Sequence, residues 1–308
     1  MNLPTNNDFE WQYNPRKSVT NVQEYAQRAS DLSTRARSRH KPICDVQYGT
    51  SPLATLDIFL AIQSDAPVHV FLHGGFWRGR DKSDYSYIAD ALIPLGITTV
   101  VMNYDLCPKA SLPEIVAQVR QGIRWIYAHA HEFSSYSEVD LESGGKNPIF
   151  VTFSGHSAGA HLLAAALAAD RGESLVPVGQ STAAVLISGI YELEPVLSIS
   201  VNAEIQLQPE QVDAMSPMRH PPLVDVPLQI VVGGGETPSW VQQSRSFADV
   251  CLRQGSDCTY RELQSHHHYS IMTLLETPDS ILTKIIRDVA TAPRRAPDSM
   301  QKPQGMQF

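Results

Sequence analysis

Short apolar runs alternate with longer segments of helical period along most of the chain. The runs are rich in β-branched and aromatic residues, which favour strands, and they lie at 68–72, 97–102, 149–153, 183–187, 228–232 and 259–263. The intervening segments predict helices at 85–95, 113–131, 158–169, 239–253 and 280–290. Strands that alternate with helices of this length predict an α/β protein, with a mostly parallel sheet covered on both faces.

The N-terminal part of the chain does not follow this alternation. Residues 1–40 are polar apart from a helical segment at 22–37, and they predict an arm and a helix that pack on the main domain. Two short apolar stretches, at 45–48 and 56–61, flank the turn sequence Gly-Thr-Ser-Pro at 49–52. This arrangement predicts a hairpin-like pair of strands.

A second departure lies between the fourth and fifth of the predicted strands named above. Residues 191–222 contain several prolines and two short helical pieces, at 203–207 and 209–215, and they predict a small cap over the carboxyl edge of the sheet. We therefore expect one main domain over 41–291. The remaining expectations are a polar surface loop at 134–147 and a flexible tail at 292–308.

The composition is that of an ordinary globular protein, and it argues against several classes. Of 308 residues, 43% are hydrophobic and 18% are charged, and the net charge of -8 speaks against a nucleic-acid-binding surface. No apolar run approaches the ~20 residues of a membrane span, and the first thirty residues lack the apolar core of a secretory signal. The four scattered cysteines predict reduced thiols, although Cys251 and Cys258 are near enough in sequence to approach each other. We expect a cytoplasmic protein that binds neither nucleic acid nor membrane.

The sequence Gly155-His156-Ser157-Ala158-Gly159 lies between a predicted strand and a predicted helix. A Gly-x-Ser-x-Gly sequence in this context is typical of a nucleophile elbow, in which a sharp turn exposes a serine. The alternative interpretation is a glycine turn in which Ser157 caps the helix. The flanking residues His156 and His161 are expected to be structural and are not needed for catalysis.

An acid and a base for this serine follow it in the chain. Glu236 lies in a loop after the strand at 228–232, and the run His266-His267-His268 lies after the strand at 259–263. The carboxyl ends of parallel strands form one edge of a sheet, where the active sites of such folds lie. Glu236 has helix capping as an alternative role, and the histidines have a polar loop or a metal site as alternatives. Asp225 and Asp257 are rival acids, but each precedes a strand.

The loop at 73–77, His-Gly-Gly-Phe-Trp, follows another predicted strand and indicates an oxyanion hole. Glycines let backbone N–H groups turn toward a substrate, and such preset donors stabilise a tetrahedral oxyanion. We expect the amides of Gly75, Phe76 and Ala158 to form this hole, with His73 holding the loop through hydrogen bonds. Ordinary core packing is the alternative for Phe76 and Trp77. The residues expected to surround the substrate are Gly74, Trp77, His156, Tyr191, His267 and Tyr269.

With these residues in hand, the chain resembles the α/β-hydrolase superfamily, in its kynurenine formamidase (arylformamidase)-like esterase branch. The matching sequences are Tyr-Asn-Pro-Arg at 13–16, His-Gly-Gly-Phe-Trp at 73–77, Gly-His-Ser-Ala-Gly-Ala-His-Leu at 155–162, Gly-Ile-Tyr-Glu-Leu-Glu-Pro at 189–195, Gly-Gly-Glu at 234–236 with Gln-Ser at 243–244, and His-Tyr at 268–269. The resemblance implies Ser157 as nucleophile, His268 as base and Glu236 as acid. Eukaryotic members of the branch tend to carry aspartate at the acid position, so Glu236 is a departure from them.

The resemblance implies a serine hydrolase that needs no cofactor or metal. Its expected substrate is an aryl formamide such as N-formylkynurenine, or a small aromatic ester or amide. The alternatives are a general carboxylesterase for short acyl esters, a non-catalytic ligand-binding protein on the same scaffold, and metal-dependent hydrolysis through His266–His268. The sequence leaves open whether the protein forms a homodimer.

Overall fold

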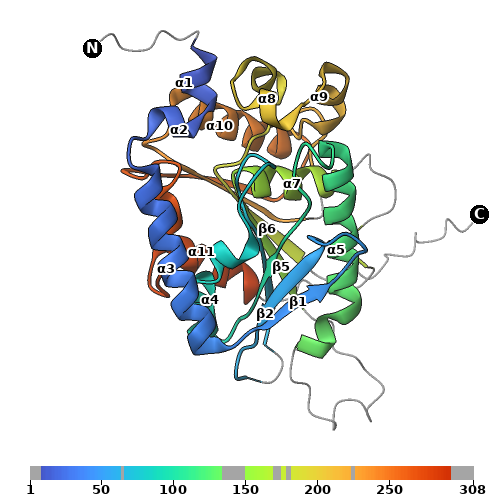
Figure 1. Ribbon diagram of the computed structural model, residues 1–308, viewed down its shortest axis with the longest axis vertical. Helices are drawn as coiled ribbons and strands as arrows, with labels where there is room; N and C mark the ends of the chain where they lie inside the picture. Colours follow the sequence, from blue (N-terminus) through green and yellow to red (C-terminus); the bar gives the residue numbers. More distant parts are fainter. Residues whose placement is uncertain are drawn as a thin grey trace, which may run out of the picture.

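An eight-stranded sheet with the order β1-β2-β4-β3-β5-β6-β7-β8 runs through the centre of the protein (Figure 1). The computed structural model describes residues 8–63, 66–133, 150–168, 175–177, 182–222 and 226–292. The strands are β1 (Ile43–Gln47), β2 (Thr55–Phe59), β3 (Val68–Leu72), β4 (Thr98–Met102), β5 (Val151–His156), β6 (Thr182–Ile187), β7 (Leu228–Gly233) and β8 (Cys258–Leu263). β1 pairs antiparallel with β2, and β2 antiparallel with β4. All the other pairs are parallel, so the predicted mostly parallel α/β-hydrolase sheet is confirmed.

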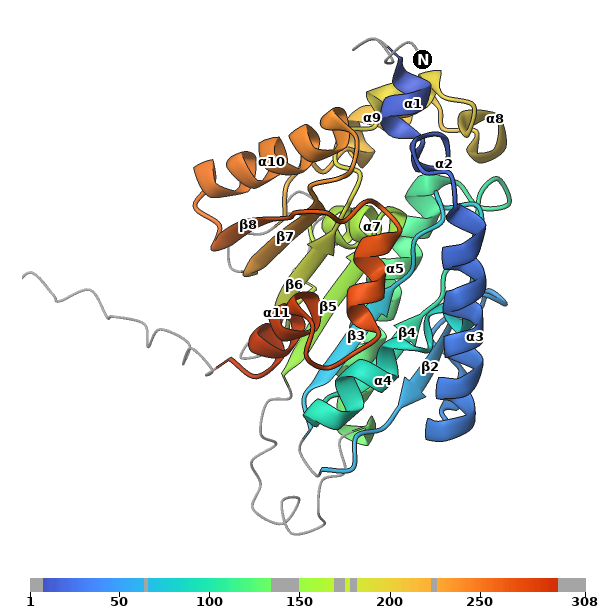
Figure 2. The same cartoon turned by 90° about the vertical axis from the view of Figure 1, so that its left-hand side faces the viewer.

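Helices cover both faces of the sheet (Figures 1 and 2). Those that pack on one face are α5 (Leu112–Phe133), α7 (Ala158–Ala166) and α10 (Pro238–Arg253). Those on the other face are α3 (Val22–His40), α4 (Ile88–Leu92) and α11 (Ile281–Ala290). Because both faces are covered, every residue of the central strands β3, β4, β5 and β6 is buried. This explains why their sequences are continuous apolar runs instead of alternating ones.

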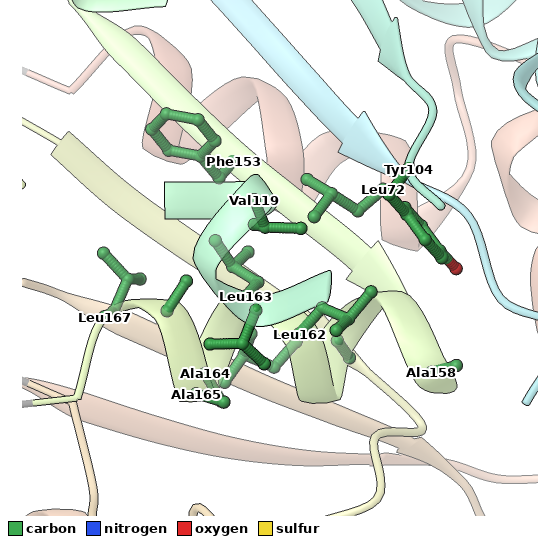
Figure 3. Close-up of a cluster of buried hydrophobic side chains, with 14 of the residues drawn as sticks. Leu72, Tyr104, Val119, Phe153, Ala158, Leu162, Leu163, Ala164, Ala165 and Leu167 are labelled. Atoms are coloured by element: carbon green, nitrogen blue, oxygen red, sulfur yellow. The ribbon is translucent and has the colours of Figure 1, made fainter. Parts of the chain in front are cut away.

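The helix α7 crosses the middle of the larger core (Figure 3). All nine of its residues are buried, and most are alanine or leucine. Small alanine side chains let this helix lie close to the sheet, while Leu162 and Leu163 fill the space toward the neighbouring elements. Val119 of α5 and Phe153 of β5 belong to the same cluster. The helix that follows the candidate nucleophile is therefore held on all sides.

The segment 85–95 was predicted as one continuous helix, but in the structure it is divided into shorter elements. The structure has a 3-10 turn η1 (Lys82–Tyr85), the short helix α4, and a second 3-10 turn η2 (Ile93–Leu95). Pro94 has no N–H to continue the α-helical bonding, and Gly96 ends the segment in the left-handed region at φ 76°. The predicted loop at 134–147 and tail residues 293–308 lie outside the described residues.

Two small segments lie beside each other at the carboxyl end of the sheet (Figure 2). The first comprises α1 (Phe9–Tyr13) and α2 (Pro15–Ser18), and the second comprises η3 (Glu194–Ser198), α8 (Asn202–Ile205) and α9 (Pro209–Met215). The Glu10 carboxylate joins them by accepting hydrogen bonds from the amide and the hydroxyl of Ser200, at 2.6 and 2.7 Å. Thr237 Oγ1 donates to the carbonyl of Gln12 at 2.6 Å and ties the N-terminal segment to α10.

The described part of the chain contains no helix that is long and apolar enough to cross a membrane. All four cysteines are free thiols, so Cys251 and Cys258 are not joined by a disulfide.

Candidate active site

Ser157 sits on a sharp turn between β5 and α7, with φ 55° and ψ -117°. The flanking glycines are required because a Cβ on Gly155 would lie 2.5 Å from the Gly159 carbonyl, and one on Gly159 would lie 2.1 Å from the Leu72 carbonyl. The Ser157 amide donates to the carbonyl of Ile187 at 2.9 Å and anchors the turn on β6. Ser157 makes no side-chain capping bond to α7, so its hydroxyl is available for other contacts. The positive φ is a strained conformation of the kind that occurs at functional sites.

The structure brings Ser157, His268 and Glu236 together. His268 Nε2 lies 3.0 Å from Ser157 Oγ, and His268 Nδ1 lies 2.7 Å from Glu236 Oε2. Both side chains behind the serine are withdrawn from water, since His268 is 6% and Glu236 is 2% exposed. These contacts allow the imidazole to take a proton from the hydroxyl while the carboxylate fixes its orientation.

Two hydrogen-bond donors hold the second carboxylate oxygen of Glu236, Oε1. Ser188 Oγ donates to Glu236 Oε1 at 2.5 Å, and the amide of Gly233 donates to the same oxygen at 2.9 Å. Ser188 was not singled out in the sequence. The indication of Ser188 in the sequence is its position as a polar residue directly after the apolar strand at 183–187. In the structure, Ser188 follows the last residue of β6, which pairs with β7.

The alternative roles considered for these residues find less support in the geometry. Thr237, not Glu236, occupies the N-cap of α10, and the Glu236 carboxylate faces His268. Asp257 lies before β8, where its carbonyl accepts from the Leu228 amide at the opposite edge of the sheet. Asp225 lies outside the described residues.

Of the three consecutive histidines, only His268 contacts Ser157. His267 Nδ1 accepts from the amides of Tyr269 and Ser270, at 3.2 and 3.3 Å, and so shapes the start of the 3-10 turn η4 (Ser270–Leu275). His266 contributes its carbonyl to the Gly235 amide at 2.8 Å. No group of three or more potential metal ligands occurs among the residues that the structure describes.

The loop after β3 passes directly beside the serine. A Cβ on Gly74 would lie 3.2 Å from Ser157 Cβ, and one on Gly75 would lie 2.2 Å from the Gly79 carbonyl. Gly75, Phe76 and Trp77 all have positive φ, so the backbone curls tightly at this point. Within the described residues, no internal acceptor is found for the amides of Gly75, Phe76 and Ala158. Such free N–H groups next to a nucleophile are suited to stabilising an oxyanion.

His73 supports this loop, in agreement with the expected structural role. Its ring nitrogens lie 2.7 Å from the Gly74 carbonyl and 2.8 Å from Asn103 Oδ1, and its ring stacks on Tyr104 at 4.3 Å. The hydroxyl of Tyr104 donates to the His73 carbonyl at 2.6 Å. Burial lowers the pKa of His73 below its usual value.

His156 supports the base. Its Nε2 lies 2.9 Å from the His268 carbonyl. Burial, together with the nearby His268 ring, lowers the pKa of His156 well below 6.5, so the ring is neutral. Because a carbonyl only accepts, Nε2 carries the proton and donates it to the backbone of His268.

A cavity of about 160 Å³ opens above Ser157. Its wall is formed by α2 and α3, the loop after β3, the segment around η1, and the segment from Tyr269 through η4. Of the residues expected around the substrate, His156 and Tyr269 line it. A cavity of roughly 150 Å³ holds one benzene ring, so the space matches a single aromatic group.

The other residues expected around the substrate do not line this cavity. Trp77 and Tyr191 are fully buried, because Trp77 packs edge-on against His161 at 4.8 Å and Tyr191 stacks on Phe247 at 4.1 Å. Gly74 lies against His156 and Ser157, and His267 lines a smaller neighbouring pocket. No residue of the expected cap at 191–222 lines the cavity. The N-terminal segment takes that place, with Pro15, Arg16 and Tyr25 among its lining residues.

Comparisons with known proteins agree with this geometry. The family model described as BD-FAE matches residues 56–184, which include the loop after β3 and Ser157. The kynurenine formamidase of Danio rerio is 28% identical over 282 residues, which cover 89% of this chain and 91% of that protein. A probable carboxylic ester hydrolase of Mycobacterium tuberculosis, LipM, is 26% identical and shares 73% of this chain and 55% of its own length. The solved structure of a putative thioesterase from Silicibacter sp. TM1040 has a TM-score of 0.73 at 24% identity, with 91% of this chain and 98% of that one covered.

The fold and these relatives make the chain a hydrolase of the α/β type. The resemblance of its motifs to the kynurenine formamidase-like esterases is confirmed by the same similarities.

Proposed function

We propose that the protein is a serine hydrolase that cleaves an aryl formamide, or a small aromatic ester or amide, through an acyl-enzyme. The observation that carries this proposal is the chain of contacts from Ser157 Oγ through His268 to Glu236, at 3.0 and 2.7 Å. Distances of this size lie within hydrogen-bond reach of a nucleophile, its base and an orienting acid.

In the first half of the reaction, Ser157 Oγ attacks the substrate carbonyl carbon as its proton moves to His268 Nε2. The resulting oxyanion accepts hydrogen bonds from the amides of Gly75, Phe76 and Ala158. The C–N or C–O bond then breaks, and His268 returns the proton to the leaving amine or alcohol. Glu236 keeps its contact with His268 Nδ1 and stabilises the imidazolium.

In the second half, water enters the place that the leaving group has vacated. His268 takes one proton from this water, the hydroxide oxygen attacks the acyl carbon, and Ser157 leaves with the proton restored to its oxygen. The products are the carboxylic acid, which is formate for a formamide, and the free enzyme.

The cavity and the relatives support an aryl formamide as substrate. The cavity is large enough to accommodate one aromatic ring beside Ser157. The Danio rerio relative named kynurenine formamidase is similar over nearly its whole length. The second candidate is a general carboxylesterase for short acyl esters, which is favoured by the similarity to LipM.

The substitution Ser157→Ala tests the mechanism. We expect the variant to fold normally and to lose ~10³-fold or more in kcat, since the loss of one triad member disables the others. Ser30→Ala, at an exposed serine on α3, is the matched control and should keep full activity. Labelling by a serine-directed phosphonate should occur in the wild type and be absent in Ser157→Ala. Undiminished hydrolysis by Ser157→Ala would contradict the proposal.

A substrate panel separates the two candidate activities. We expect kcat/KM for N-formylkynurenine to exceed the values for p-nitrophenyl acetate and for longer acyl esters. A preference for the esters would favour the carboxylesterase. If the phosphonate labels the protein but none of these compounds is hydrolysed, the substrate is neither an aryl formamide nor a short acyl ester.

A further inference from the structure

Two thiols lie together at the ends of α10 and β8 that are remote from the cavity. Cys251 is in the last turn of α10, and Cys258 is the first residue of β8. The helix packs on the strand, and Cys258 packs against the hydrophobic cluster that contains Cys251. Along the helix, Cys251 lies about 20 Å from Pro238, at a rise of ~1.5 Å per residue. The pair therefore takes no part in the proposed reaction.

The turn between α10 and β8 brings the two thiols together. The amide of Ser256 donates to the carbonyl of Cys251 and the amide of Gly255 donates to the carbonyl of Leu252, both at 3.0 Å. Gly255 has the left-handed φ of 90° that this type of helix end requires. Across the turn, the Cys251 thiol donates a hydrogen bond to the Cys258 sulfur. The two sulfur atoms are thus already in contact in the folded protein.

The two thiols differ in their access to solvent and in their acidity. Cys251 is fully buried, whereas Cys258 is only partly buried. The hydrogen bond from Cys251 lowers the pKa of the Cys258 thiol, although burial and the carboxylates of Asp257 and Asp249 act in the opposite direction. The same hydrogen bond, together with burial, raises the pKa of Cys251. Because oxidants react with the thiolate form of an accessible cysteine, Cys258 is the thiol that an oxidant meets first.

We propose that Cys258 is a peroxide-reactive thiol and that Cys251 forms a disulfide with it. The oxidant is a hydroperoxide, which converts thiolates to sulfenic acids. The new bond joins the end of α10 to the start of β8. Glu236 directly precedes the N-cap of α10, and His268 follows β8, so the bond stabilises the two elements beside which the acid and the base lie.

The oxidation takes place in two steps. In the first step, the Cys258 thiolate attacks one oxygen of hydrogen peroxide and the O–O bond breaks. The sulfur becomes a sulfenic acid, and the leaving hydroxide takes a proton from solvent. In the second step, Cys251 attacks the Cys258 sulfur while its own proton passes to the departing hydroxide. The S–O bond breaks and an S–S bond forms, so that two thiols lose two protons and two electrons and the peroxide is reduced to water.

Peptide mapping tests the disulfide directly, because Arg253 lies between the two cysteines. Trypsin places Cys251 in the peptide 246–253 and Cys258 in the peptide 254–261. The whole chain is treated with hydrogen peroxide and digested without a reductant. We expect the two peptides to be joined, with two hydrogen atoms fewer than in the separate peptides, and to separate again when a reductant is added.

Three variants separate the roles of the thiols. In Cys251→Ser, oxidation should stop at the Cys258 sulfenic acid, which dimedone labels on the peptide 254–261. In Cys258→Ser, dimedone should not label Cys251, because that thiol is buried. Cys44→Ser, at an exposed thiol on β1, is the matched control and should give the joined peptides of the wild type. Four thiols that persist after treatment, or joined peptides that contain Cys44 or Cys107 instead of this pair, would overturn the proposal.

The thermal midpoint of unfolding measures the effect of the bond on the fold. A disulfide that closes so short a loop is expected to raise the midpoint by ~4 °C in a chain of this size. After oxidation, Cys44→Ser should show the same rise, whereas Cys251→Ser and Cys258→Ser should show none. Joined peptides with an unchanged or lower midpoint would overturn the stabilising role. Neither peptide mapping nor thermal unfolding involves hydrolysis, so both outcomes are independent of the proposed function.

Discussion

Within the site, the turn that carries Ser157 is built from backbone packed on backbone, whereas the wall that carries Arg16 is built from long side chains of distant segments. At the turn, Gly159 lies so close to β3 that an added Cβ would meet the Leu72 carbonyl at 2.1 Å. At the wall, by contrast, a Cβ added to Gly79 would meet no neighbouring atom within 4 Å. The two regions face the same cavity but differ in how much freedom they leave to substitution.

This difference separates two properties of the enzyme. In the proposed mechanism, Ser157, His268 and Glu236 act on the reacting atoms, which every substrate shares. The wall would contact the rest of the substrate, which differs between substrates. Changes in the first region should therefore lower the rate for all substrates alike, and changes in the second should alter the ranking of substrates.

The largest effect is expected for Glu236→Gln. The Gly233 amide can only donate, so the amide oxygen of the glutamine must take the place of Oε1 and its NH₂ group must face His268 Nδ1. This orientation forces the proton of the imidazole onto Nε2, where it cannot accept from Ser157. We expect kcat to fall by ~10³ to 10⁴-fold, as in other triads with the acid replaced by its amide.

The loss should be the same for N-formylkynurenine and for p-nitrophenyl acetate, measured by steady-state kinetics. Glu262→Gln on β8 is the control, since Glu262 pairs with Arg245 away from the cavity. A loss below about 10-fold, or one confined to one of the two substrates, would contradict the separation of the two regions.

The next effect is a loss of stability in Gly159→Ala. The added methyl group would meet two backbone carbonyls, those of Leu72 and His73, and backbone cannot move aside as a flexible side chain does. Overpacking of this kind is expected to lower the free energy of unfolding by about 3 kcal/mol. Gly79→Ala should change it by less than about 0.5 kcal/mol. Urea denaturation of both variants measures the difference, and equal values would show that the turn is no more constrained than the wall.

The turn could be predicted from the sequence because its constraints are local. Gly155, Ser157 and Gly159 are neighbours in the chain, and the apolar run before them and the alanines after them are visible in the same stretch. The acid and base could be predicted as well, since parallel strands deliver their carboxyl ends to one edge. Their positions after predicted strands were sufficient to single out Glu236 and the run His266–His268, and the choice of His268 within that run came from the resemblance.

The wall could not be predicted because its residues meet only through the tertiary fold. Arg16 and Tyr25 precede the first strand, and nothing in their local pattern indicates that they reach the loop after β3. The aromatic residues Trp77 and Tyr191 were expected at the cavity because they lie near the motifs. The fold buries them instead, since large apolar rings beside a site fill the core as readily as they line a pocket.

The last prediction concerns the strands beneath the turn. His69 on β3 is fully buried, with its ring nitrogens 2.8 Å from Thr152 Oγ1 and 2.7 Å from Ser154 Oγ on β5. Burial lowers the pKa of His69 to about 3, from about 6.5 in the unfolded chain. Below pH 6.5 the unfolded chain therefore binds a proton that the folded protein does not bind.

It follows that His69 stabilises the fold above pH 6.5 and that this contribution is lost as the pH falls from 6.5 toward 3, by about 1.4 kcal/mol for each pH unit. His69→Asn should lower stability at neutral pH but reduce the slope of the free energy of unfolding against pH within this window. Urea denaturation at pH 7, 6, 5 and 4 measures the slope. His131→Gln, at an exposed ring near the end of α5, should leave the slope as it is in the wild type. An unchanged slope in His69→Asn would mean that the protonated ring is tolerated between β3 and β5, and that the core under the turn is less rigid than the turn itself.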